Sequence, residues 1–388
     1  MSDILGSIDK TVFVLGAGFS RAFVETAPLM EGFLRPHTDL LKPNHPGKPG
    51  YKPRDPDPFR PVREFIERCG MVPESLNIET LLTLASLQRH WMSIDDSLSG
   101  SLTAERTKRL ISTVIQCSFP TVSVGDGRWK ITVKEEDALR RFARHLLFNT
   151  TAHVITFNYD PLLENFLELE KEKYAPIDLH RFDVRYSYGF RGVHYLSRNW
   201  VDDAAVRPPD APLFFLKLHG STQWVPRRLH GQPAFPDDIL ITSCHQDSER
   251  GFGYHDVFFE PNATFIIPPV LDKSSMLSHP VVSAIWARAA ELLATADQIV
   301  FLGYSFPSTD YYAEFLFRYH AEKSAQITVV NWVDPRWPRD KQASLKEMIL
   351  NRFKSILPQI QDDHFSFGGA AEYCGRMVDP APASPPSI

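Results

Sequence analysis

Cysteine is scarce in this chain of 388 residues, which has only four. They are widely separated in the sequence, at Cys69, Cys117, Cys244 and Cys374. No Cys-x-x-Cys pair occurs, so the sequence indicates neither a disulfide framework nor a zinc ribbon, and we expect no metal cofactor.

Three further features are missing. No apolar run approaches the length that spans a membrane, and the first ten residues lack the basic and apolar regions of a secretory signal. We therefore expect a cytoplasmic protein with no membrane partner. The net charge is -5, so a general basic surface is absent too, and direct nucleic-acid binding is not expected.

An apolar strand that runs into a glycine turn and an amphipathic helix is the most informative segment. Gly16 and Gly18 allow a tight turn and a close approach of the backbone to a pyrophosphate at the start of the helix. A dinucleotide is therefore the first candidate ligand, although Arg21 replaces the third glycine of the dehydrogenase fingerprint. The candidate binding residues are Gly16, Ala17, Gly18, Phe19, Ser20 and Arg21.

Further apolar runs end in polar or glycine residues, as expected for a parallel sheet that is buried on both faces. They are Val154–Asp160, Leu216–Ser221, Val300–Phe306 and Ile327–Trp332. Helical patterns alternate with them at 134–148, 162–172, 281–295 and 311–320. The prediction is an α/β, Rossmann-like three-layer sandwich with a mostly parallel sheet, whose chemistry lies beyond the carboxyl ends of the strands.

The segment between the first two strands differs in composition. Prolines crowd residues 36–61, where we expect a loop without regular structure, and residues 61–118 read as helices. We divide the chain into a Rossmann-like domain at 1–34 and 135–375, an insertion of proline-rich loop and helical subdomain at 35–134, and a disordered tail at 376–388.

Three polar residues after strands are candidates for catalysis. Asn158 can hold ribose hydroxyls or a water molecule, because a carboxamide both donates and accepts hydrogen bonds. Asp160 points to the same side if the chain stays extended. His219 has the residue type of a general base, although a histidine at a strand end is more often structural. Ser305 and Asn331 are either cofactor contacts or turn and cap residues.

The series GAGFS, TFNYD, LHGS, GYSF and VVNW resembles the sirtuin superfamily, and more closely the bacterial sirtuin-like NAD-consuming effectors of antiphage defence. The resemblance implies a pyrophosphate loop at Gly16–Ser20 and a catalytic base at His219. It assigns the remaining motif residues to the NAD site: Thr156, Asn158, Asp160, Gly303, Ser305 and Asn331.

That branch of the family hydrolyses NAD+ to nicotinamide and ADP-ribose, and some members cyclise the product, so infected cells lose NAD. Members commonly work as homo-oligomers or beside a translocase-type ATPase or an Argonaute-like protein. Phe157 replaces the glutamine of protein deacylases, and their four-cysteine zinc module has no counterpart. A deacylase and a non-catalytic nucleotide-sensing assembly module remain the alternatives, with a dehydrogenase further behind.

Overall fold

The computed structural model describes most of the folded chain and leaves gaps within it. Described are residues 10–29, 32–42, 59–91, 133–174, 181–190, 212–226 and 279–379, short pieces at 121–123, 129–131, 193–195, 228–229, 232–233, 239–241 and 265–267, and single positions between 103 and 118. Residues 43–58 of the proline-rich segment and 380–388 of the tail lie outside the described residues.

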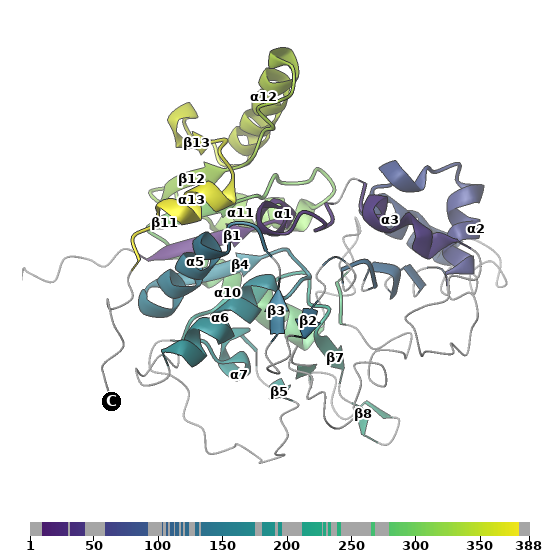
Figure 1. Ribbon diagram of the computed structural model, residues 1–388, viewed down its shortest axis with the longest axis horizontal. Helices are drawn as coiled ribbons and strands as arrows, with labels where there is room; N and C mark the ends of the chain where they lie inside the picture. The colour runs from purple at the N-terminus through teal and green to yellow at the C-terminus, as the bar shows by residue number, and fades with distance from the viewer. Residues whose placement is uncertain are drawn as a thin grey trace, which may run out of the picture.

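A six-stranded parallel sheet forms the centre of the fold (Figure 1). Its strands are β1 (Thr11–Leu15), β4 (Ala152–Thr156), β6 (Phe215–Lys217), β11 (Gln298–Leu302), β12 (Gln326–Val330) and β13 (Phe365–Ser366). They lie in the order β13-β12-β11-β1-β4-β6, so the sheet grows outward in both directions from the contact of β1 with β11, as in a doubly wound Rossmann sheet. This confirms the predicted α/β fold class.

Register places the ends of five strands at one level. Leu15 pairs with Leu302 and with Thr156, and these strands pair onward to β12 and β6. The last residues of the five strands are Leu15, Thr156, Lys217, Leu302 and Val330. The residues that follow them therefore share one edge, and the order of the sheet reverses there between β1 and β11.

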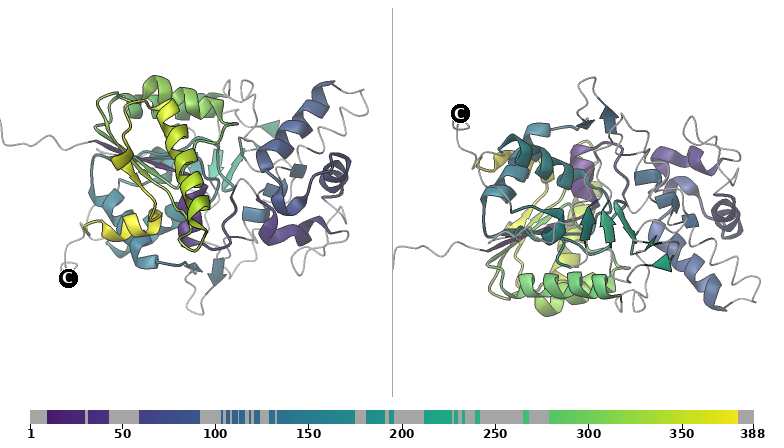
Figure 2. Two further views of the ribbon diagram at one scale, coloured as in Figure 1. Left: turned by 90° about the horizontal axis from the view of Figure 1, so that it is seen from above. Right: turned by 90° about the horizontal axis from the view of Figure 1, so that it is seen from below.

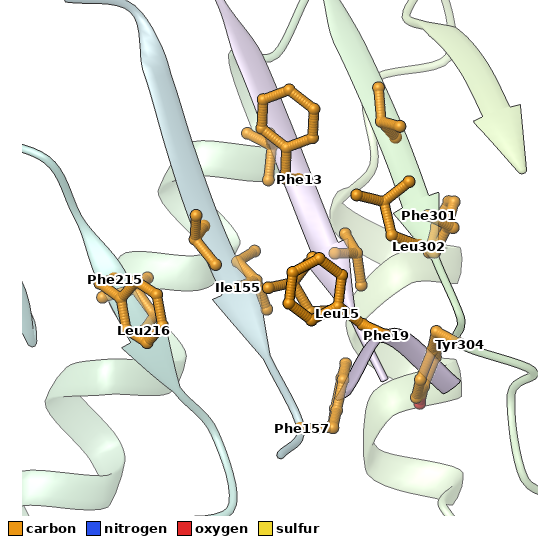
Figure 3. Packing of buried hydrophobic residues seen from close by; sticks show 14 of the residues in the cluster. Phe13, Leu15, Phe19, Ile155, Phe157, Phe215, Leu216, Phe301, Leu302 and Tyr304 are labelled. Carbon is orange, nitrogen blue, oxygen red and sulfur yellow. The ribbon is translucent and has the colours of Figure 1, made fainter. Parts of the chain in front are cut away.

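Helices cover both faces of the sheet (Figure 2). One face carries α1 (Ala17–Phe23), α5 (Glu136–Phe148), α6 (Leu162–Lys173) and α13 (Ala370–Arg376), and the other carries α10 (Pro280–Ala294), α11 (Tyr311–His320) and α12 (Arg339–Ile356). Figure 3 shows the buried side chains between these layers, with Phe13 and Ile155 along the strands and Phe157 and Tyr304 beyond the strand ends.

The segment between β1 and β4 builds a second core beside the sheet (Figures 1 and 2). It contains η1 (Arg35–Leu41), α2 (Arg60–Arg68), η2 (Pro73–Ser75) and α3 (Ile78–Trp91). Tyr159 and Ile266 belong to the same cluster of buried side chains, so this core meets the main fold at those two residues. Within 36–61, η1 corrects the prediction of no regular structure, because Pro36 stands in its first turn, where proline is tolerated.

Smaller elements complete the fold. They are α7 (Val184–Ser187), η3 (Asp362–His364), a sheet of β5 (Val193–Tyr195), β10 (Ile239–Ile241) and β7 (Trp224–Pro226), and the pairs β2 (Thr121–Ser123) with β3 (Trp129–Ile131) and β8 (Arg228–Leu229) with β9 (Gln232–Pro233). In the described parts of the chain, every helix is too short or too polar to cross a membrane.

Two helix ends lie close to the expected domain boundaries. The first helix ends at Phe23, because Val24 adopts an extended conformation and Pro28 follows. At the other end, α13 extends to Arg376, and Arg144 Nε donates to Asp379 Oδ1 at 2.9 Å. The start of the segment expected as a tail is therefore bound to α5.

Candidate functional site

Three glycines meet where the order of the sheet reverses. Gly303 has a φ of +64°, and a Cβ there would lie 2.1 Å from Phe19 N. A Cβ on Gly16 would lie 2.6 Å from Gly303 O, and Gly18 N donates to that same oxygen at 3.0 Å. These glycines are required because the turn after β1 and the turn after β11 touch through their backbones.

The other candidate residues after β1 have structural contacts. Phe19 is buried against Phe23 and Phe142 in the core, so it is a packing residue, while Ala17 is half-buried. Arg21 is exposed, and its guanidinium donates to the carbonyls of Glu25 and Ala27. Arg21 thus binds the backbone beyond α1, rather than facing the start of that helix.

A buried chain of hydrogen bonds joins the turn after β1 to the loop after β4. Asn158 Nδ2 donates to Gly16 O and to Ser20 Oγ, both at 3.0 Å. Ser20 Oγ donates in turn to Asp160 Oδ2 at 2.9 Å. Thr156 Oγ1 accepts the Asn158 N–H at 3.1 Å. Both of these Asn158 side-chain bonds use its nitrogen, so the amide is oriented and its oxygen is the acceptor that it can offer a ligand.

A buried lysine binds the loop that carries Asn158 and Asp160. Lys217, the last residue of β6, places its Nζ 2.6 Å from Asp160 O and 2.7 Å from Glu164 Oε1. Burial raises the pKa of both Asp160 and Glu164, and the Lys217 ammonium counters that effect. The loop that carries Asn158 is therefore held by Ser20, through the side chains of Asn158 and Asp160, and by Lys217, through the Asp160 carbonyl.

His219 lies between aromatic rings at the same edge. Its ring meets Phe157 edge-on at a centroid distance of 5.2 Å and lies 6.1 Å from Tyr159. Its Nε2 lies 3.2 Å from Asp310 Oδ2, and both side chains are buried. The backbone is fixed as well, because Ile267 N donates to His219 O at 2.8 Å.

Phe157 stacks on Tyr304 at 4.4 Å with nearly parallel rings (Figure 3). Asn331 is buried, and its Nδ2 donates a hydrogen bond to Tyr304 O at 3.0 Å. Asn331 therefore supports the turn after β11. Burial raises the pKa of both Tyr159 and Tyr304 well above its ordinary value, and both phenols stay neutral. The rings that contact His219, those of Phe157 and Tyr159, are therefore uncharged.

The cap of α11 is Asp310 and not Ser305. Ser305 is exposed, whereas Asp310 caps α11 by accepting the Ala313 N–H at 3.3 Å. The cap interpretation of Ser305 is therefore wrong, because α11 begins only at Tyr311. An aspartate directly before an apolar helix was a visible cap signal, but nothing in the sequence linked it to His219.

Lys217 was also missed. A lysine in an apolar strand reads as a surface residue, and its partners Asp160 and Glu164 lie more than fifty positions away. Among the residues that the structure describes, no three His, Cys, Asp or Glu side chains gather as a set that could hold a metal ion.

Comparison with known proteins gives one family. No curated protein matches the chain. A family model described as a SIR2-like domain matches residues 152–352, which include Asn158, Lys217, His219 and Asp310. That span begins at β4, runs through β6, β11 and β12, and covers more than half of the sequence. The chain belongs to the SIR2-like domain family.

Proposed function

We propose that this protein is an NAD+ glycohydrolase that releases nicotinamide and ADP-ribose. SIR2-like domains use NAD, and this chain has the fold of that family. The observation that carries the proposal lies at the carboxyl edge of the sheet, beside the glycine contact of β1 and β11. There Asn158 is bonded to Ser20, and His219 packs on Phe157 and Tyr159, the two chain neighbours of Asn158. Rossmann sheets bind dinucleotides at this edge.

The residues suit a sugar ligand. Ser20 and Asp160 orient the Asn158 amide, whose oxygen is available to accept a hydrogen bond from a ribose hydroxyl or a water molecule. His219 is placed to take a proton. In the reaction, the bond between ribose C1′ and the nicotinamide nitrogen breaks, and nicotinamide leaves as a neutral ring with the bonding pair. A water oxygen bonds to C1′, and its proton passes through His219 to solvent.

Hydrolysis is favoured over deacylation by the residue between Thr156 and Asn158. Phe157 stands where protein deacylases carry a glutamine, and its ring is engaged with Tyr304 and His219. An aromatic contact replaces a polar amide at that point, so the side chain offers no hydrogen bond to an acyl group. We extend the proposal to an antiphage effector that depletes the NAD of an infected cell and is controlled by assembly or by a partner protein.

The test is to incubate the purified protein with NAD+ at several protein concentrations and to measure nicotinamide and ADP-ribose by chromatography. We expect His219→Ala and Asn158→Ala to lower the rate at least about 100-fold, as loss of a general base or a positioning group does. His320→Ala, at the end of α11, is the matched control and should keep the rate of the wild type.

A rate that rises more steeply than protein concentration would support control by assembly. Full activity in His219→Ala would contradict the proposed base. Binding of NAD+ without any nicotinamide release, at every protein concentration, would favour the sensing module instead.

A further inference from the structure

The two carboxylate oxygens of Asp310 have different partners. Oδ1 accepts the backbone N–H of Ala313 at 3.3 Å and starts α11. Oδ2 lies 3.2 Å from His219 Nε2. Asp310 is 3% exposed and His219 is 5% exposed, so water does not screen their contact. One carboxylate therefore joins the start of a helix on one face of the sheet to the histidine that follows β6.

The imidazole has little freedom to turn away from this carboxylate. The plane of the Phe157 ring stands at 77° to the imidazole, and that of Tyr159 at 30°. Tyr159 is itself tied down, since its hydroxyl donates to Ile267 O at 3.1 Å. The residue before His219 is fixed too, because Trp286 Nε1 donates to Leu218 O at 3.2 Å.

Resting on the hydrolase function proposed above, we propose that Asp310 is the positioning residue of His219. The carboxylate keeps the neutral imidazole in the tautomer with its proton on Nε2, so that the lone pair lies on Nδ1. When Nδ1 takes a proton from water or a ribose hydroxyl, the O–H bond breaks, an N–H bond forms, and Asp310 stays ionised beside the imidazolium. A carboxylate does this for the histidine of a serine protease triad.

Charged groups on neighbouring elements also act on the rings beside His219. The charges of Asp310 and Glu79 both act to raise the pKa of Tyr159 and of Tyr304, while Arg352 lowers that of Tyr304. Glu79 is a buried residue of α3, which brings it from the second core. On the side of β6, Lys217 is already neutralised by its own carboxylate partner.

Two substitutions distinguish the contact of Asp310 with His219 from its role as the cap of α11. Asp310→Asn keeps a side-chain oxygen for Ala313 N, but it replaces the ionised acceptor at His219 with an amide. Asp310→Ser keeps a good cap residue and cannot span to the histidine. Both variants should therefore fold, and their melting temperatures should stay within a few degrees of the wild type. Glu314→Gln, which removes a carboxylate that binds Arg318 and Arg352 on the same helix, is the matched control.

The kinetic experiment measures NAD+ hydrolysis from pH 5 to 9. Asp310→Asn should lower kcat about 100- to 10,000-fold with little change in KM, since the group acts on the base rather than on ligand binding. The fall in its rate on the acid side of the pH profile should move to lower pH, because an imidazolium without a carboxylate neighbour loses its proton more easily. Glu314→Gln should keep the profile of the wild type.

The second experiment does not depend on turnover. Nitrogen chemical shifts of protein labelled in its histidines report tautomer and titration, and the spectrum of His219→Gln identifies the resonances of His219. The wild type should show the proton on Nε2, and Asp310→Asn should show a changed tautomer and a lower pKa. Unchanged His219 shifts and titration in Asp310→Asn would overturn the positioning role, even if the protein hydrolyses NAD+. A changed tautomer with no hydrolysis by the wild type would support the contact and contradict the proposed function.

Discussion

The two ends of the sheet each bury a histidine, and they treat it in opposite ways. At the amino end, His153 in β4 accepts the Phe214 N–H at 3.3 Å, and burial lowers its pKa to about 3, with Arg181 and Lys10 adding to the effect. At the carboxyl end, His219 lies beside Asp310. Burial, aided by two cations, keeps His153 neutral, while His219 has a carboxylate partner. The same side chain is structural at one end and suited to proton transfer at the other.

Each end also buries a cation, with a different kind of partner. Arg181 at the amino end donates to backbone carbonyls, those of Leu146, Asn149, Thr150 and Ala152. Lys217 at the carboxyl end donates to Glu164 and to the carbonyl of Asp160. Arg181 therefore binds the backbone between α5 and β4, whereas Lys217 supports the loop that carries Asn158. Three substitutions test this contrast.

The largest effect is expected at the carboxyl end, from Lys217→Met. Removal of the ammonium leaves the buried Glu164 without its ion-pair partner, and we expect a loss of about 4 kcal/mol in the free energy of unfolding. Urea unfolding followed by circular dichroism measures it. The double variant Lys217→Met with Glu164→Gln should regain part of the loss, since no unpaired carboxylate remains. Arg288→Ala breaks an exposed ion pair with Glu291 and should cost less than about 1 kcal/mol.

The second prediction concerns the backbone contact between β1 and β11. Gly303→Ala should lower stability by about 3 kcal/mol, because its Cβ would overlap Phe19 N and its φ is positive. Gly70 has the same φ of +64°, and a Cβ added there would meet no atom within 4 Å, so Gly70→Ala carries only the conformational cost of about 1 kcal/mol. Thermal unfolding of both variants measures the difference that is due to the close contact at Gly303. Equal losses of stability in the two variants would show that this contact contributes nothing.

The smallest effect is expected at the amino end and depends on pH. His153 binds a proton in the unfolded chain near pH 6.5, but in the folded chain only near 3, so its stabilising contribution is present above pH 6.5 and is lost as the pH falls toward 3. Between pH 7 and pH 5, His153→Gln should lose about 2 kcal/mol less than the wild type. Denaturant titrations at the two pH values measure this, with the half-buried His320→Gln as control. Identical pH dependence in all three proteins would contradict the assignment.

Much of the fold followed from local patterns. Buried parallel strands are continuous apolar runs, so these runs located β1, β4 and β11, and α11 was placed at its observed bounds. The strand β13 could not be predicted, because two residues carry no periodicity. Parallel strand order also explains why Ser20, Asn158 and Asp160 were expected at one edge. The contact of His219 with Asp310 depends on where α11 begins in space, which spacing along the chain does not encode.

The place of the second core in the chain has a consequence for how this fold can vary. The core is inserted between β1 and β4, which are neighbours in the sheet, so its two ends return to adjacent strands and its size does not affect their register. The entropic cost of lengthening such a connection grows only slowly with the number of residues. The second core, which meets the main fold at Tyr159 beside His219, can therefore change in length and surface without altering the pairing of these two strands. New surfaces can thus arise at this single junction, without change to the sheet.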